Sequence, residues 1–354
     1  MSLLDRLERL EALDPKSMRG LLQSFPAQVA GAAQVVKTLS LRVPSEIGHV
    51  VVAGMGGSAI GGDVIRAATS ETLRAPMIVC RDYRLPGFVD SSTLVFASSY
   101  SGNTEETLSA YEQARTAGAS IICLTSGGKL AALASSAGYP VILLPSGLPP
   151  RAALGYSAVM LLGALRALHL VPDTEVPLRE TVEVLRRRVD LYVPESPESG
   201  NPAKKLARSL HRRLVAIYAS SAVLEPAAVR WRGQIEENAK SLAFHHLVPE
   251  MNHNELVGWE FPMPLLQRIA VVFLRDKGDH PQVQRRFDLT RNMVGRRTGI
   301  VHDVWSEGDS LLARIFSVIC LGDFVSFYMA CLNQVDPTPV PVIETLKKQL
   351  STPG

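Results

Sequence analysis

The chain has 354 residues, of which 46% are hydrophobic and 20% are charged, and its formal net charge is +3. A chain of this length is expected to form two domains of ordinary size, each with its own core. The composition is typical of a compact soluble protein, and the small net charge gives no support to a nucleic-acid or acidic-membrane partner.

The cysteines and the N-terminal segment point to the cytoplasm. The cysteines lie far apart without CxxC spacing, so we expect free thiols in a reducing compartment at Cys80, Cys123, Cys320 and Cys331. Residues 1–20 predict an amphipathic helix, and they lack the apolar core and cleavage site of a signal peptide. Apolar runs elsewhere are too short and interrupted to span a bilayer comfortably. We therefore expect a cytoplasmic protein.

Strand-like and helix-like segments alternate over residues 30–165. The segment His49–Gly54 is rich in β-branched residues and predicts a buried strand. Further apolar segments that end in small polar residues follow it at 75–83, 92–101, 120–128 and 140–147. Fully apolar strands that alternate with amphipathic helices indicate a parallel sheet covered on both faces. We predict one doubly wound α/β domain over this range.

The same pattern restarts in the second half of the chain. Residues 166–199 predict a connecting helix and a linker rich in Pro, Ser and Glu. New strand segments and a long buried helix then follow, at 213–221, 267–278, 299–308 and 311–332. The sequence therefore predicts a second α/β domain over 200–335. A helical segment at 1–29 precedes the two domains, and a proline-rich tail that ends in a short helix, 336–354, follows them.

Two loops that follow predicted strands have the composition of an anion site. In the first, Gly57 and Ser58 follow the strand at 49–54, and in the second, "SSYSGNTEET" leads into a helix. The first amide groups of a helix have no partner within it and bear partial positive charge. Serine and threonine hydroxyls add donors, and glycine lets the backbone approach closely. Together these features suit a phosphate monoester.

A dinucleotide site is the main alternative for the first loop. Gly54-x-Gly56-x-x-Ala59 fits the G-x-G-x-x-A fingerprint, which is weak evidence alone. That fold also needs an acidic residue at the end of its second strand to hold the ribose. Asp82, the nearest candidate, comes too late and lies beside two arginines. The phosphate monoester is thus favoured, and a turn that binds nothing is the remaining alternative.

Five motifs resemble one known family. "GMGGSAIGGD", "SSYSGNTEET", "PPRAALGYS", "ENAK" and "MNHNE" are similar to the bifunctional phosphoglucose/phosphomannose isomerases, which contain two sugar isomerase (SIS) domains. The similarity spans nearly the whole chain. It implies a metal-independent enzyme without cofactor that interconverts glucose 6-phosphate and fructose 6-phosphate in glycolysis and gluconeogenesis, and that also accepts mannose 6-phosphate. By matching, the substrate phosphate would bind at Gly57, Ser58, Ser99, Ser101 and Thr104.

The same resemblance assigns the groups that move a carbonyl between C1 and C2. This chemistry needs a base, a cation for the enediolate, and an acid–base group that opens the sugar ring. Matching selects Glu237 as the base, Arg151 as the cation and His253 as the ring opener. Lys347 would assist at the ring oxygen. In the family the histidine comes from the partner subunit, which implies a homodimer.

Alternatives stay open at several of these positions. Glu236 precedes Glu237, and because neighbouring helix residues point about 100° apart, only one is expected to face the substrate. Lys348 is an alternative to Lys347. Thr338 is a candidate for the contact with the C2 hydroxyl that distinguishes mannose from glucose.

Two other classes of protein compete with the isomerase. A non-catalytic SIS regulator would need the phosphate loops but not Glu237, Arg151 and His253, and no DNA-binding helix-turn-helix is apparent in the sequence. A nicotinamide-dependent dehydrogenase would need a dinucleotide site. The isomerase is favoured over both, with a sugar phosphate as its small-molecule partner.

Overall fold

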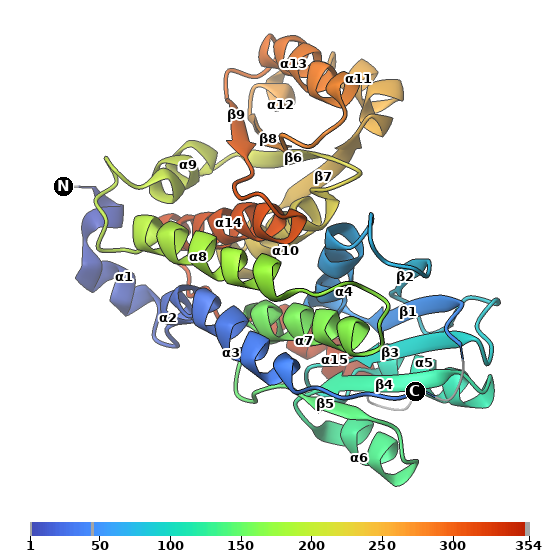
Figure 1. Cartoon of the computed structure of the whole chain (residues 1–354). Coiled ribbons are helices and arrows are strands. Elements are labelled where there is room, and N and C mark those ends of the chain that lie inside the picture. The colour runs from blue at the N-terminus through green and yellow to red at the C-terminus, as the bar shows by residue number, and fades with distance from the viewer. Residues whose placement is uncertain (1, 44–45, 351–354) are drawn as a thin grey trace.

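The apolar, β-branched segments form two separate parallel sheets in a computed structural model that describes residues 2–43 and 46–350. In Figure 1 the second domain lies at the top and the first at the lower right, with long helices between them. The expectation of two doubly wound α/β domains is therefore confirmed.

The first sheet has five parallel strands in the order β2-β1-β3-β4-β5. Its strands are β1 (His49–Gly54), β2 (Met77–Cys80), β3 (Thr93–Ser98), β4 (Ser120–Thr125) and β5 (Val141–Leu143). Its helices are α4 (Gly56–Ala68), α5 (Glu105–Thr116), α6 (Gly128–Ser136) and α7 (Leu154–Ala167). The strand order reverses between β1 and β3, and ligands of such sheets bind outside the carboxyl ends of the strands at that point.

The second sheet has four parallel strands in the order β7-β6-β8-β9. They are β6 (Leu214–Ser220), β7 (Ala243–Val248), β8 (Ile269–Arg275) and β9 (Val301–Trp305). Around them lie α9 (Pro202–Leu210), α10 (Glu225–Ala239), η3 (Glu250–His253), α11 (Glu255–Gly258), α12 (Met263–Leu266) and α13 (Pro281–Gly295). The sequence did not predict β7, because His245 and His246 interrupt the apolar pattern of this edge strand.

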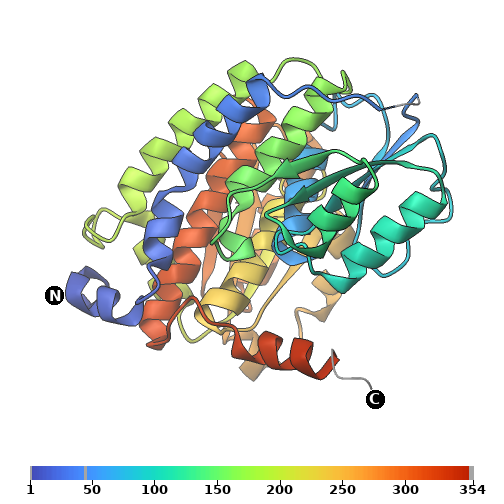
Figure 2. The same cartoon turned by 90° about the horizontal axis from the view of Figure 1, so that it is seen from below.

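A layer of long helices joins the two domains. The predicted buried helix is α14 (Leu311–Asn333), which packs against α10 and against α8 (Glu175–Tyr192). Figure 2 shows α8 and α14 beside α3 (Phe25–Lys37) and α7. Among the described residues, α14 is the one helix long and apolar enough to cross a membrane, but its apolar stretch is buried inside the protein. It is therefore a core helix.

The N-terminal segment forms several short helices instead of one, and the C-terminal tail forms an exposed helix. The expected helix at 1–20 is wrong in detail, since η1 (Leu3–Asp5), α1 (Leu7–Leu13) and α2 (Met18–Gln23) are separate. Asp14 and Pro15 end α1, and the Asp14 carboxylate accepts hydrogen bonds from the first amides of α2. The boundary proposed at residues 29 and 30 falls inside α3. At the other end, α15 (Pro341–Leu350) has no buried residue.

Candidate functional site

The two predicted phosphate loops meet where the strand order of the first sheet reverses. β1 pairs with β3, so the glycine loop that begins α4 lies beside the serine loop that precedes α5. The Ser98 hydroxyl donates to the Ser58 carbonyl (3.2 Å), and the Ser58 hydroxyl accepts from the Tyr100 amide (3.0 Å). These bonds fix one loop against the other and form a single rim of hydroxyl and amide groups.

The hydroxyls of the serine loop lie at different depths. Ser99 is buried, and its Oγ lies 2.9 Å from Oγ1 of Thr104, which is half-buried. Thr104 precedes α5, but its side chain does not cap the helix. The first backbone N–H groups of α5 therefore remain available as hydrogen-bond donors. Ser101 is exposed. Gly102 has φ +67°, and a Cβ there would lie 1.8 Å from the Gly127 carbonyl oxygen, so only glycine fits.

The glycine loop also touches the turn that carries Arg151. This turn is η2 (Pro150–Ala152), directly before α7. A Cβ at Gly57 would come within 2.8 Å of the Pro150 carbonyl group, so the missing side chain permits this close packing. The phosphate loops and Arg151 are thus parts of one assembly, although the sequence separates them widely.

The Arg151 guanidinium is buried and held in one orientation. Its Nε donates to Asn238 Oδ1 (2.8 Å), and its Nη2 donates to the carbonyls of Pro337 (2.9 Å) and Thr338 (2.7 Å). The remaining nitrogen, Nη1, lies 3.5 Å from Oε2 of Glu237. Burial lowers the pKa of Arg151, and the negative charge of Glu237 opposes that effect. The guanidinium therefore directs its Nη1 nitrogen toward the predicted base.

Glu237 and Arg151 line a pocket of about 260 Å³ between the two domains. Gly56, Gly57, Ile60, Arg81, Val229, Arg230, Arg232, Gly233, Gln234 and Glu236 also line it. Both glutamates line this pocket, and which of them faces the substrate stays a prediction. Glu236 pairs with Arg232 at 3.8 Å, and burial raises its pKa, whereas Glu237 faces Arg151. The two acids thus have different partners.

His253 and the lysines of the tail lie outside this pocket. His253 ends η3 and is exposed, and Lys347 and Lys348 are exposed on α15. The structure therefore brings Gly57, Arg151 and Glu237 together, but within one chain it does not add His253 or either lysine to them.

A partly buried hydrogen-bond network fixes the loop of His253. Glu255, two residues after it, accepts a hydrogen bond from the Tyr218 hydroxyl, and its other carboxylate oxygen lies 2.6 Å from Nδ1 of His246. The indole of Trp259 donates to the same hydroxyl (3.0 Å). Burial raises the pKa of Tyr218 far above its usual value, so the hydroxyl keeps its proton and remains a donor. An exposed histidine thus stands on an anchored loop.

Sequence reasoning missed a set of polar residues behind the pocket. Arg230 and Gln234 lie on the buried side of α10, and both contact Asp323 on α14. The sequence does contain a signal, because Asp323 is the only charged residue of α14 beyond its first turn. Among residues 2–43 and 46–350, no group of three or more His, Cys, Asp or Glu side chains is arranged to hold a metal ion.

The chain is similar in sequence and fold to known sugar-phosphate enzymes. The family described as bacterial phospho-glucose isomerase C-terminal SIS domain matches residues 199–350. A bifunctional phosphoglucose/phosphomannose isomerase of Caldicellulosiruptor bescii is 47% identical over 93% of this chain and 97% of its own. One of Aquifex aeolicus is 35% identical over 85% of this chain and 90% of its own.

A curated protein with a different name and a solved structure extend the comparison. A D-glucosamine-6-phosphate 4-epimerase of Sulfolobus acidocaldarius is 34% identical over 57% of this chain and 61% of its own. The structure of a glucose-6-phosphate isomerase like protein from Thermus thermophilus covers 97% of this chain and 100% of its own, with TM-score 0.65 and 20% identity. That likeness is one of fold.

Proposed function

The chain belongs to the family of bifunctional phosphoglucose/phosphomannose isomerases, and from this membership we propose that it interconverts glucose 6-phosphate and fructose 6-phosphate and also isomerises mannose 6-phosphate. The observation that carries the proposal is the pairing of Glu237 with Arg151 in a pocket bordered by the glycine loop. A carboxylate beside a fixed guanidinium can remove a proton and stabilise the negative charge that results.

The phosphate of the substrate binds the rim formed by the two loops. Amides at the starts of α4 and α5 and the hydroxyls of the serine loop donate to its oxygens. The groups involved are Gly57, Ser58, Ser99, Ser101 and Thr104. Donors that are already fixed, such as the hydroxyls of Ser99 and Thr104, lose little conformational entropy on binding the phosphate, so binding of this remote group positions C1 and C2 near the base.

Isomerisation then proceeds by proton transfer at carbon. Glu237 takes the proton from C2 of the open aldose, the C2–H electrons form the enediolate double bond, and negative charge develops on the carbonyl oxygen. Arg151 stabilises that oxygen through Nη1, its nitrogen that faces Glu237. Return of the proton to C1, with transfer of the hydroxyl proton from O2 to O1, gives the ketose. No step passes through a metal or another cofactor.

Ring opening requires an acid–base group near the ring oxygen. We assign it to His253 of a second copy in a homodimer, with Lys347 beside the ring oxygen. The exposure of both residues and the anchoring of the His253 loop by Glu255 support this assignment. We place the reaction in the cytoplasm, in glycolysis and gluconeogenesis, where Cys80, Cys123, Cys320 and Cys331 would stay free thiols.

Acceptance of mannose 6-phosphate depends on how the C2 hydroxyl is held. Thr338 lies beside Arg151, whose Nη2 binds its carbonyl. Its buried hydroxyl has no hydrogen-bond partner among the described residues. A buried donor without a partner is costly, and a substrate hydroxyl would relieve that cost. We assign Thr338 to the C2 contact.

Conversion of fructose 6-phosphate in the presence of EDTA tests the proposal. The wild type should turn over both fructose 6-phosphate and mannose 6-phosphate under chelation. Glu237→Gln should lower kcat by about 10²–10⁴-fold with little change in affinity, because it removes the base and leaves the phosphate rim intact.

Glu236→Gln is the matched control, since Glu236 borders the same pocket on the same helix. It should retain most of the turnover. A wild type that binds fructose 6-phosphate without converting it would instead identify a sugar-phosphate-binding regulator, and activity lost only on chelation would contradict the metal-independent mechanism.

A further inference from the structure

A ladder of buried polar groups connects α14 to Arg151. Arg230, Gln234 and Asn238 are spaced by four residues, so they share the face of α10 that packs on α14. Asp323 accepts two hydrogen bonds from Arg230, Nε to Oδ1 (2.9 Å) and Nη2 to Oδ2 (2.8 Å). Gln234 donates to Oδ1 at 3.0 Å. Both members of the ion pair are about 5% exposed.

Two of these α10 residues form hydrogen bonds with Arg151. Nη2 of Arg230 donates to the Arg151 backbone carbonyl (2.8 Å), while Asn238 accepts from the Arg151 side chain (2.8 Å). Asn238 in turn donates to the Ser326 hydroxyl (3.0 Å), which donates to the Asp323 backbone carbonyl (2.7 Å). Residues of α10 therefore fix both the main chain and the guanidinium of Arg151. Residues of α14, in turn, hold these α10 residues in place.

Stability alone does not account for this arrangement. The free energy needed to desolvate two charges nearly equals the free energy gained from their attraction. Apolar residues of similar volume often stabilise a core equally well. What an apolar pair cannot supply is a donor for the Arg151 carbonyl. Catalysis is sensitive to such placement, because a shift of about 1 Å at a reacting group can cost about 10²-fold in rate.

We propose that Asp323 is a positioning residue of the isomerase: it holds Arg230 against the backbone carbonyl of Arg151. It thereby fixes Nη1, the guanidinium nitrogen that meets the enediolate. The proposal rests on the function proposed above. Asp323 itself touches no substrate, since it lies behind α10 and does not border the pocket.

Two variants separate positioning from folding. The double variant Arg230→Met with Asp323→Leu removes both charges and keeps the core filled, but it leaves the Arg151 carbonyl and the Gln234 amide without these partners, so it should fold and melt moderately below the wild type. Arg230→Lys retains a charge opposite Asp323, but a lysine ammonium cannot reproduce the fork that reaches both the carboxylate and the Arg151 carbonyl. Both variants should lower kcat by about tenfold or more while KM for fructose 6-phosphate stays within about twofold.

Two inhibitors provide a readout that a loss of stability would not change. Arabinonate 5-phosphate carries a carboxylate where the enediolate forms, whereas glucitol 6-phosphate carries no second anion. In both variants the affinity for arabinonate 5-phosphate should fall by about the same factor as kcat, because Arg151 acts on that charge. The affinity for glucitol 6-phosphate should not change, because the phosphate rim lies on the first domain.

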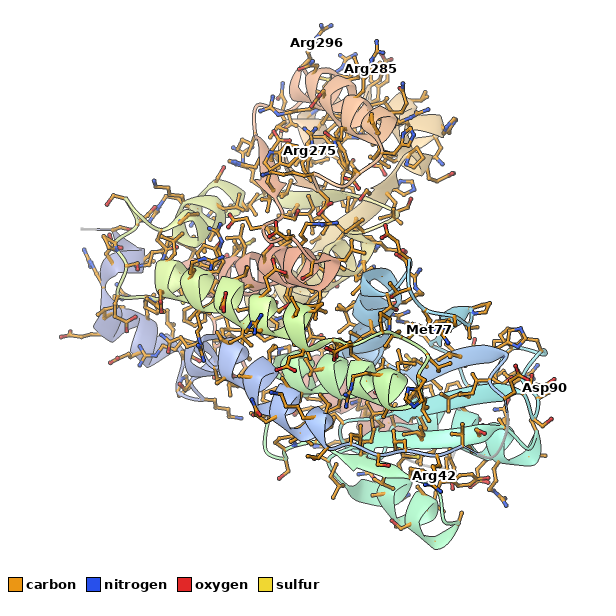
Figure 3. All side chains as sticks on the ribbon, in the orientation of Figure 1. Arg42, Met77, Asp90, Arg275, Arg285 and Arg296 are labelled. Carbon is orange, nitrogen blue, oxygen red and sulfur yellow. The ribbon has the colours of Figure 1, made fainter. Side chains whose placement is uncertain are left out.

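Asp276→Asn is the matched control. Asp276 is another fully buried aspartate, paired with Arg314 of α14 at 3.0 Å, and none of its carboxylate's hydrogen bonds to the described residues reaches α10 or Arg151. It follows Arg275, which Figure 3 labels in the second domain. This control should lower the melting temperature without lowering kcat.

The outcomes distinguish this inference from the function on which it rests. A wild-type kcat in either variant, or an equal loss of affinity for both inhibitors, would overturn the positioning role. A wild type that never isomerises would overturn the proposed function, and the two inhibitor affinities would still measure how the variants place Arg151.

Discussion

Arg151 and His253 are both assigned to the substrate, yet the chain surrounds them in opposite ways. Arg151 is 6% exposed, and Asn238, two backbone carbonyls and Glu237 surround its guanidinium. His253 is exposed at the end of a short helix, and only the loop beneath it is anchored, through Glu255. One chain therefore completes the part of the site that we assign to the enediolate but leaves the residue that we assign to ring opening on its surface.

The exposed helix α15 belongs to the second kind of region. Figure 2 shows it extending away from the layer of long helices. Its apolar residues Val342 and Leu350 are 80% and 63% exposed, and Lys347 lies between them in sequence. A helix with an uncovered apolar side gains most of its stability from packing against another surface. The proposed homodimer would supply such a surface. We therefore expect substitutions in the two regions to differ in whether activity returns when two variant chains are combined in one dimer.

The largest expected effect is at His253. His253→Ala should lower kcat by about 10²–10⁴-fold with glucose 6-phosphate, because the closed ring then lacks its acid–base group. When this variant is coexpressed with Glu237→Gln, half of the dimers carry one intact site, and about a quarter of the wild-type activity should return. Steady-state rates of the purified mixture measure this recovery.

Arg151→Lys coexpressed with Glu237→Gln is the control for the mixing experiment. Both substitutions fall in the pocket of one chain, so every site of the mixed dimer remains defective and no recovery is expected. Failure of His253→Ala to recover would show that this histidine does not act across an interface, and the comparison would have to be abandoned.

A smaller loss is expected for Arg151→Lys alone. An ammonium cannot bind Asn238 and the two carbonyls and also face Glu237, since these contacts use the separate nitrogens of a guanidinium. kcat should fall by about 10²-fold and KM should change little. If KM rose in proportion while kcat stayed unchanged, Arg151 would be a substrate-binding residue with no special role in the transition state.

The sequence predicted the elements of the fold better than the contacts between them. The segment His49–Gly54 was expected to be a strand and is β1, because its apolar, β-branched run is long and ends in glycine. The edge strand β7 was missed, because four of its six residues are only half-buried and two of them are histidines. Local pattern thus identifies central strands, whereas an edge strand depends on its neighbour.

The same limit applies to the candidate site. The phosphate loops are continuous motifs, so their residues were recognisable in the sequence. The contact between Arg151 and Glu237 joins two domains, and the position of Asp323 behind it follows from the packing of α10 on α14. Spacing along the chain contains no information about such contacts. The outward location of His253 and Lys347 likewise appears only once the pocket is assembled.

The tail offers a test of intermediate size. Lys347→Ala should lower kcat by about tenfold with glucose 6-phosphate, because one positively charged group near the ring oxygen is lost. Lys348→Ala is the paired variant on the same helix, and a loss confined to it would transfer the role to Lys348.

The smallest effects are expected in the phosphate rim, which, like the surroundings of Arg151, lies within a single chain. Thr104→Ala and Ser101→Ala each remove one hydroxyl, so each should raise KM by about fivefold, or about 1 kcal/mol, with kcat unchanged. Thr104 should have the larger effect, because its hydroxyl is held by Ser99 at 2.9 Å whereas Ser101 is exposed and must be ordered by the ligand.

Inhibition by inorganic phosphate gives a second measurement of the same contacts and should weaken in parallel. Ser136→Ala is the control, since that hydroxyl only bonds the Leu133 carbonyl on α6. If the two rim substitutions lowered kcat and left phosphate inhibition unchanged, the phosphate would bind elsewhere, and the rim would have to be regarded as part of the catalytic half of the site.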